Sequence, residues 1–70
     1  MSTFKYFCNV VINEGFDKQD VMSRFSDVVN PLECSNRVFQ TLLTTDDINN
    51  FNQDETIQFI ELNRNQVTDD

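Results

Sequence analysis

The amino-acid sequence predicts one small domain of the α+β class, and three observations lead to this prediction. The chain has 70 residues, which is the size of a single domain. Hydrophobic residues make up 39% of it and include seven Phe, which is too apolar for a disordered segment. Segments that alternate with a period of two, typical of strands, are interleaved with segments that have helical spacing and capping residues.

The first predicted element is a strand over residues 3–13, where polarity alternates along the chain. The face formed by the odd-numbered residues of this strand is half apolar, because it carries Phe7 and Val11. A strand with apolar residues on both faces is expected near the centre of its sheet. Its fully apolar face holds Phe4, Tyr6, Cys8, Val10 and Ile12.

A helix is predicted to follow, with Asp17 as its N-cap and Asp20 as a favourable negative charge in its first turn. We expect it to end at Asn30, because Pro31 disfavours the helical conformation in the residue before it. The apolar residues between these points have the spacing of one buried helical stripe. They are Val21, Met22, Phe25, Val28 and Val29.

Two strands are predicted next, an edge strand over residues 32–34 and a central strand over residues 37–43. A single bent strand over the whole segment is the alternative. Thr44 or Thr45 is then expected to cap a short helix whose Ile48 and Phe51 face inward.

The last strand is predicted over residues 56–62, which are rich in Ile and Phe. Residues 63–70 have almost no apolar content, so we expect a flexible, acidic C-terminal tail after a domain that spans residues 1–62. The element order is then β-α-β-β-α-β. With right-handed crossovers this order gives a ferredoxin-like two-layer sandwich, with both helices on one sheet face and the first and third strands central. The alternative is β-α-β-α-β with a long middle strand.

Residue content argues against catalysis and metal binding. The sequence has no His, so it lacks the commonest general base and the commonest metal ligand. Cys8 and Cys34 therefore have no His to activate them, and Cys8 is expected to be a core residue. We predict a protein that is not an enzyme and needs no metal or other cofactor. Without a secretion signal or an apolar stretch of about 18 residues, we expect a cytoplasmic protein with reduced thiols.

A small metal-dependent nuclease is the enzymatic alternative. In length and element order the chain resembles the ferredoxin-like endoribonucleases of CRISPR adaptation systems, which place an Asp at the end of the first strand. Here the corresponding run is Val10-Val11-Ile12-Asn13-Glu14. This run ends in Asn13 and Glu14 where those enzymes have the Asp. Paired carboxylates suit metal-assisted phosphodiester hydrolysis, and the candidate pair here is Glu14 and Asp17.

Negative charge is concentrated in the C-terminal third of the chain. The net charge is −7; residues 1–45 hold five acidic residues against four basic ones, whereas residues 46–70 hold seven acidic residues against Arg64. This charge disfavours direct binding to nucleic acid or to anionic membranes. A solvated acidic face is one interpretation, and a docking face for a basic protein surface is the other. The candidate partner-binding residues are Asp46, Asp47, Asp54, Glu55 and Glu61.

The predicted function is that of an acidic protein-binding module that occupies the basic, nucleic-acid-binding surface of a larger protein. Small acidic domains of this kind are typical of phage-encoded inhibitors, which would place the protein in a host cytoplasm. A second possibility is self-association, as a structural or accessory subunit. If the helices cover one sheet face, Phe7 and Val11 lie on the other and are candidates for a homodimer contact.

Overall fold

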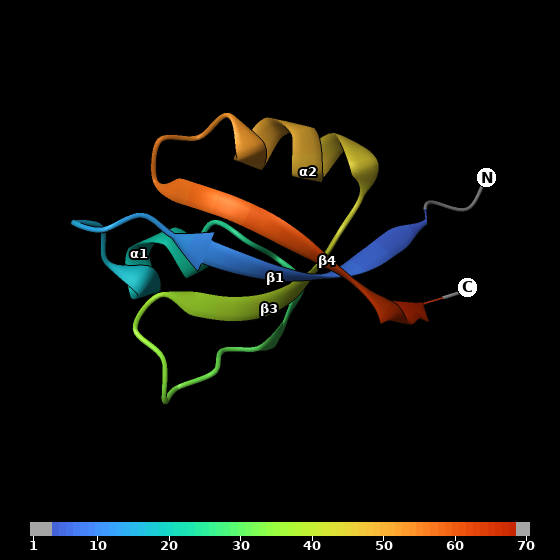
Figure 1. Cartoon of the computed structure of the whole chain (residues 1–70), viewed down its shortest axis with the longest axis horizontal. Coiled ribbons are helices and arrows are strands. Elements are labelled where there is room, and N and C mark those ends of the chain that lie inside the picture. The colour runs from blue at the N-terminus through green and yellow to red at the C-terminus, as the bar shows by residue number, and fades with distance from the viewer. Residues whose placement is uncertain (1–3, 69–70) are drawn as a thin grey trace.

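The computed structural model describes the backbone of residues 4–68 and the side chains of residues 4–62. Four strands form one antiparallel sheet in the order β2-β3-β1-β4, and two helices pack against it (Figure 1). The predicted small α+β class is confirmed. The alternative with one long middle strand is wrong, because β2 and β3 are separate strands. The elements are β1 (Lys5–Ile12), α1 (Lys18–Met22), β2 (Val28–Asn30), β3 (Val38–Leu43), α2 (Thr45–Asn52) and β4 (Ile57–Thr68).

The core lies on the even-numbered face of β1. Cys8, Val10 and Ile12 have no exposed surface, and Phe39 on the neighbouring strand β3 is also fully buried. Val10 stands opposite Phe39 in the register of β1 with β3, so strict alternation on both strands directs their apolar side chains to the same side. The two most apolar strands therefore occupy the centre of the sheet.

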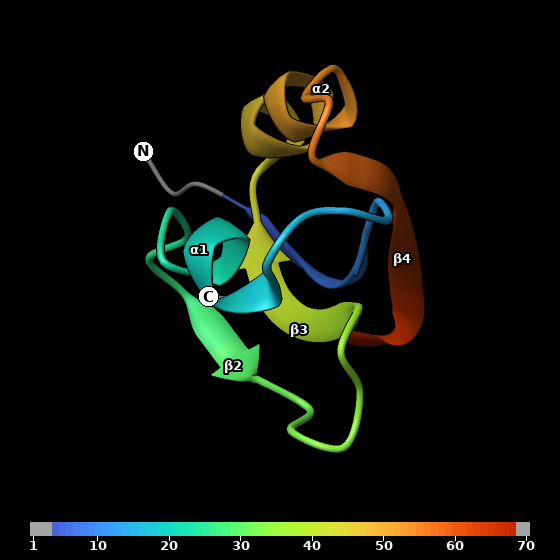
Figure 2. The ribbon, with the colours of Figure 1, turned by 90° about the vertical axis from the view of Figure 1, so that its left-hand side faces the viewer.

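Both helices contribute to this same core, so both lie on one face of the sheet (Figure 2). Val21 of α1 is 3% exposed, and Ile48 and Phe51 of α2 pack against the buried cluster. Phe25 follows α1 and joins the layers. Its ring centroid lies 5.0 Å from that of Phe39, edge to face, and 4.1 Å from that of Phe51, stacked.

Helix α2 begins as the sequence predicts. Thr44 is the N-cap, and its hydroxyl oxygen accepts a hydrogen bond from the backbone N–H of Asp47 at 3.1 Å. The Asp47 carboxylate accepts one from the Thr44 backbone N–H at 3.3 Å, which completes a capping box. Among residues 4–68, neither helix is long and apolar enough to cross a membrane.

Helix α1 is much shorter than predicted. Asp17 is its N-cap, as expected, but the helix ends at Met22 instead of running to Val29. The reason lies in residues 27–30, whose backbone bonds to β3 instead. The carbonyl of Asp27 accepts hydrogen bonds from the Leu42 N–H and the Thr41 hydroxyl. The β-branched residues that follow suit a strand, and they form the edge strand β2.

The edge strand therefore lies earlier in the chain than predicted. Residues 32–34 form a turn, and Leu32 has a φ of +50°, a left-handed conformation that cannot continue a strand. The central strand predicted over residues 37–43 is confirmed to within one residue as β3.

Strand β4 extends to Thr68, six residues beyond its predicted end at Leu62. Its register with β1 shifts between Tyr6, opposite Val67, and Cys8, opposite Leu62. One residue of β1 separates these two pairs, whereas four residues of β4 separate them, so β4 is irregular over residues 63–66. The flexibility of the predicted tail stays a prediction, and Asp69 and Asp70 lie outside the described residues.

The two cysteines occupy contrasting environments. Cys8 is fully buried in the core and its thiol donates a weak hydrogen bond to the carbonyl of Tyr6, whereas Cys34 is exposed in the turn before β3. Burial raises the pKa of the Cys8 thiol to about 11. Both thiols are free in the structure.

We expect one thiol to react rapidly with Ellman's reagent and the other to react only when the domain opens. Cys34 is accessible, while Cys8 is neither accessible nor deprotonated at neutral pH. Stopped-flow absorbance should show two well-separated phases, and Cys34→Ser should remove the fast one. Equal rates for both thiols under native conditions would contradict the buried position of Cys8.

Candidate functional site

The five candidate acidic residues do not form one patch. Asp46 and Asp47 lie in the first turn of α2, and Asp54 and Glu55 lie beyond its last residue. The two ends of this eight-residue helix are about 12 Å apart, and the helix axis runs along the long axis of the molecule (Figure 1). Glu61 stands opposite Asn9, on the sheet face that bears no helix. Acidic groups are therefore distributed around β4 and α2.

Asp54 is committed to contacts within the domain. Its carboxylate accepts a hydrogen bond from the Arg24 guanidinium at 2.9 Å. The other carboxylate oxygen accepts from the Thr56 hydroxyl at 2.6 Å and the Thr56 backbone N–H at 2.9 Å. Arg24 also donates to the Thr56 hydroxyl at 2.7 Å, which closes a ring of three side chains. This ring fastens the segment after α1 to the turn between α2 and β4.

The ring changes the acidity of Asp54. Hydrogen bonds from Arg24 and Thr56 hold the pKa of this carboxyl well below its usual range. Asp54 is thus ionised but largely neutralised by an internal partner, which makes it a poor contact for another protein. Sequence spacing alone does not pair Arg24 with Asp54, because the two lie on separate elements.

The remaining acidic candidates have no basic partner in the described part of the chain. Within residues 4–62, ion pairs join Lys5 to Asp27 and Arg24 to Asp54. Three of the remaining candidates are exposed and one is half-buried, and none takes part in these pairs. Their negative charge is available to another molecule. They are Asp46, Asp47, Glu55 and Glu61.

The open face of the sheet differs from the prediction. Phe7 is only 9% exposed, so it is not an accessible contact residue, because its ring is covered within the domain. Val11 is half-buried and stands opposite Phe59 of β4, which is 48% exposed. Phe59 was not a sequence candidate, since its face is determined by the register between the first and last strands. The accessible apolar pair of this face is therefore Val11 and Phe59.

The residues of the nuclease alternative do not assemble a metal centre. Glu14 is exposed in the turn after β1, and the Asp17 carboxylate accepts a hydrogen bond from the Gln19 backbone N–H at 3.4 Å as the cap of α1. Among the described residues, no three Cys, Asp or Glu side chains converge as metal ligands would. Capping accounts for the position of Asp17.

We expect Asp54→Ala to lower the free energy of unfolding by about 1 kcal/mol at neutral pH, because it breaks the ring with Arg24 and Thr56. The effect is modest because Arg24 is 44% exposed and solvent screens the ion pair. Since the folded-state pKa is depressed, the stabilisation is present above the unfolded-state pKa of about 4 and is lost as the pH falls further. Urea titrations of both proteins across this range measure it.

Glu55→Ala is the matched control, since the neighbouring carboxylate is exposed and has no basic partner in the described residues. It should change stability by less than about 0.5 kcal/mol. Equal stability of Asp54→Ala and the unmodified chain at neutral pH would show that the ring does not hold the turn.

Comparison of the chain with models of known families, with curated proteins and with solved structures found no match. The geometry and charge of the described residues are thus the basis for a functional proposal.

Proposed function

We propose that the chain is a non-enzymatic, acidic protein-binding module that acts on a larger protein by occupying its basic, nucleic-acid-binding surface. The observation that carries this proposal is the set of carboxylates on α2, on the turn after it and on β4 that form no ion pair with the side chains of residues 4–62. Those on α2 and β4 are held by a capped helix and a paired strand, and the turn that carries Glu55 is fastened by the ring of Arg24, Asp54 and Thr56, so that their spacing is preorganised. Preorganised carboxylates can take the place of phosphates on a basic surface and speed the encounter.

The structure changes which residues we assign to the contact. Asp54 is bonded to Arg24 and serves the fold, and Asp47 is part of the capping box. Asp46, Glu55 and Glu61 have exposed side chains without such a role. The proposed contact therefore centres on Asp46 and Glu55 beside α2, while Glu61 lies on the open face of the sheet, outside this contact.

We further propose that the domain is a variant of the ferredoxin-like sandwich. The element order β-α-β-β-α-β, the central position of β1 and β3, and two helices on one sheet face support this assignment. This form of the sandwich has a first helix of only five residues and an edge strand of only three residues.

Charge reversal tests the protein-binding function. Immobilised protein is used to capture a partner from a lysate of the native host, and the captured protein is then tested for displacement of its nucleic acid. Asp46→Lys/Glu55→Lys should reduce capture at least tenfold, because the variant repels a basic surface. Raising the salt concentration should weaken capture by the unmodified protein.

Glu14→Lys/Asp20→Lys is the matched control, since it makes the same change in net charge on the other helix and turn. Asp20 lies in the first turn of α1, as Asp46 does in α2, so the two variants perturb helix ends equally. Equal capture by all three proteins, or equal loss in both variants, would contradict a contact at α2.

Self-association is a second candidate function, favoured by the exposed Phe59 beside Val11 on the open sheet face. If two copies pack through this face, sedimentation velocity at about 100 µM should show a dimer that Phe59→Ser converts to a monomer. Phe16→Ser is the control, since Phe16 is similarly exposed but lies before α1. A monomer at every concentration removes this candidate.

A further inference from the structure

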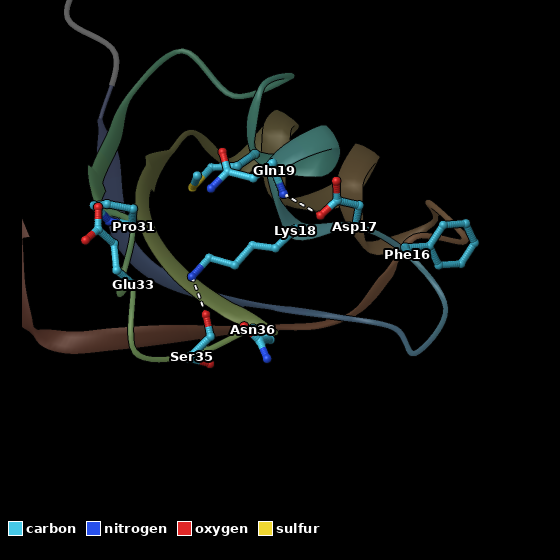
Figure 3. A pocket seen from close by; sticks show the side chains of 9 residues that line it. Phe16, Asp17, Lys18, Gln19, Pro31, Glu33, Ser35 and Asn36 are labelled. Atoms are coloured by element: carbon cyan, nitrogen blue, oxygen red, sulfur yellow. Dashed lines mark hydrogen bonds between the residues drawn. The ribbon is translucent and has the colours of Figure 1, made fainter.

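Lys18 is a buried cation without an acidic partner in the described part of the chain. The residue is only 8% exposed, yet no carboxylate among residues 4–62 forms an ion pair with it. Its ammonium group donates to the carbonyl oxygen of Leu32 at 2.8 Å and to that of Ser35 at 2.6 Å, the second of which Figure 3 shows. Both acceptors are neutral. A buried charge normally has a counter-ion, because removal from water is otherwise costly.

The loop that surrounds this ammonium group is held in a specific shape. Leu32 has the left-handed φ of +50°, and its N–H donates to the Asn30 side chain at 3.1 Å. The Ser35 hydroxyl accepts from the N–H groups of Arg37 and Val38 at 3.3 and 3.2 Å. An unfavourable backbone conformation persists where the surroundings impose it, and such positions cluster at ligand sites.

Lys18 also lines a pocket of about 520 Å³, large enough for a small organic molecule. Its lining combines the apolar residues Met22 and Pro31 with the polar residues Gln19 and Asn36, whereas the Phe16 ring at its rim points away from Lys18 (Figure 3). An ammonium group has three N–H donors, and the structure uses two of them on backbone carbonyls. The third is available to an acceptor that enters the pocket.

We propose that this pocket binds a small monocarboxylate with an apolar body, whose carboxylate pairs with Lys18. The lack of a counter-ion for Lys18 among the described residues favours an anion, and the Met22 and Pro31 side chains favour an apolar body. Asp17 and Glu33 also line the pocket, but their carboxylates are directed away from the Lys18 ammonium group (Figure 3). Their negative charge opposes any anion in the pocket, and it opposes a dianion such as phosphate more strongly than a monocarboxylate that contacts Lys18 directly. The site is independent of the acidic residues on α2 and β4.

NMR titration of the ¹⁵N-labelled chain with hexanoate, acetate and inorganic phosphate at constant ionic strength tests this proposal. Hexanoate should shift the Lys18 ammonium signal and the Ser35 and Asn36 amides in a saturable way. It should bind about tenfold more tightly than acetate, because its methylene groups enter the apolar part of the pocket. Saturable phosphate binding without hexanoate binding would overturn the ligand class. No saturable shift with any probe would overturn the site.

Two variants complete the test. Glu33→Gln removes a competing charge from the pocket and should tighten hexanoate binding, whereas Glu14→Gln, outside the pocket, should leave it unchanged. Lys18→Met should abolish binding in a chain that circular dichroism shows to be folded. If this variant does not fold, the affinity of Glu33→Gln for hexanoate and the Lys18 ammonium signal of the unmodified protein show whether the carboxylate binds beside Lys18. An unchanged affinity in Glu33→Gln would contradict a carboxylate bound beside Lys18.

Discussion

The stacked contact between Phe25 and Phe51 is the interaction on which the arrangement of the two helices depends. Phe25 also meets Phe39 of the central strand β3, so one ring connects both helices to the sheet. A helix of five residues such as α1 is not stable alone, because so few hydrogen bonds do not offset the free-energy cost of helix nucleation. Tertiary packing by Val21 and Phe25 must hold it in place. Arg24 adds a second fastening on the outside, through its contacts with Asp54 and Thr56.

The parts of the fold that follow from local chemistry were predictable. Alternation identified β1 and β3, and the Thr44 cap identified α2, because such signals depend only on neighbours in the chain. The prediction of a helix through Val28 and Val29 is wrong, because these residues form strand β2. Its apolar spacing suits a buried helical stripe as well as a strand, and pairing with β3 determines the outcome. Local pattern contains no information on that pairing.

The candidate site was likewise predictable only in part. Composition shows where the negative charge lies along the chain, but it does not show which carboxylates form hydrogen bonds or ion pairs within the domain. Asp54 differs from its neighbour Glu55 only because Arg24, distant in sequence, reaches it. Lys18 had no sequence signal as a site residue, since a lysine at a helix start is ordinarily solvated. Its burial results from the turn at Leu32 and Ser35 folding over it. The availability of the charged groups on this small surface therefore depends on long-range contacts.

The pairing of β1 with β4 has a consequence for the order of assembly. The first and last strands of the described chain are neighbours in the sheet, with Cys8 opposite Leu62. The edge of β1 that faces β4 thus stays unpaired until residues 57–68 have been synthesised. Such high contact order slows folding and leaves an apolar edge exposed on the nascent polypeptide. Pairing with β4 covers this edge of β1 and so removes a site at which another chain could add a strand.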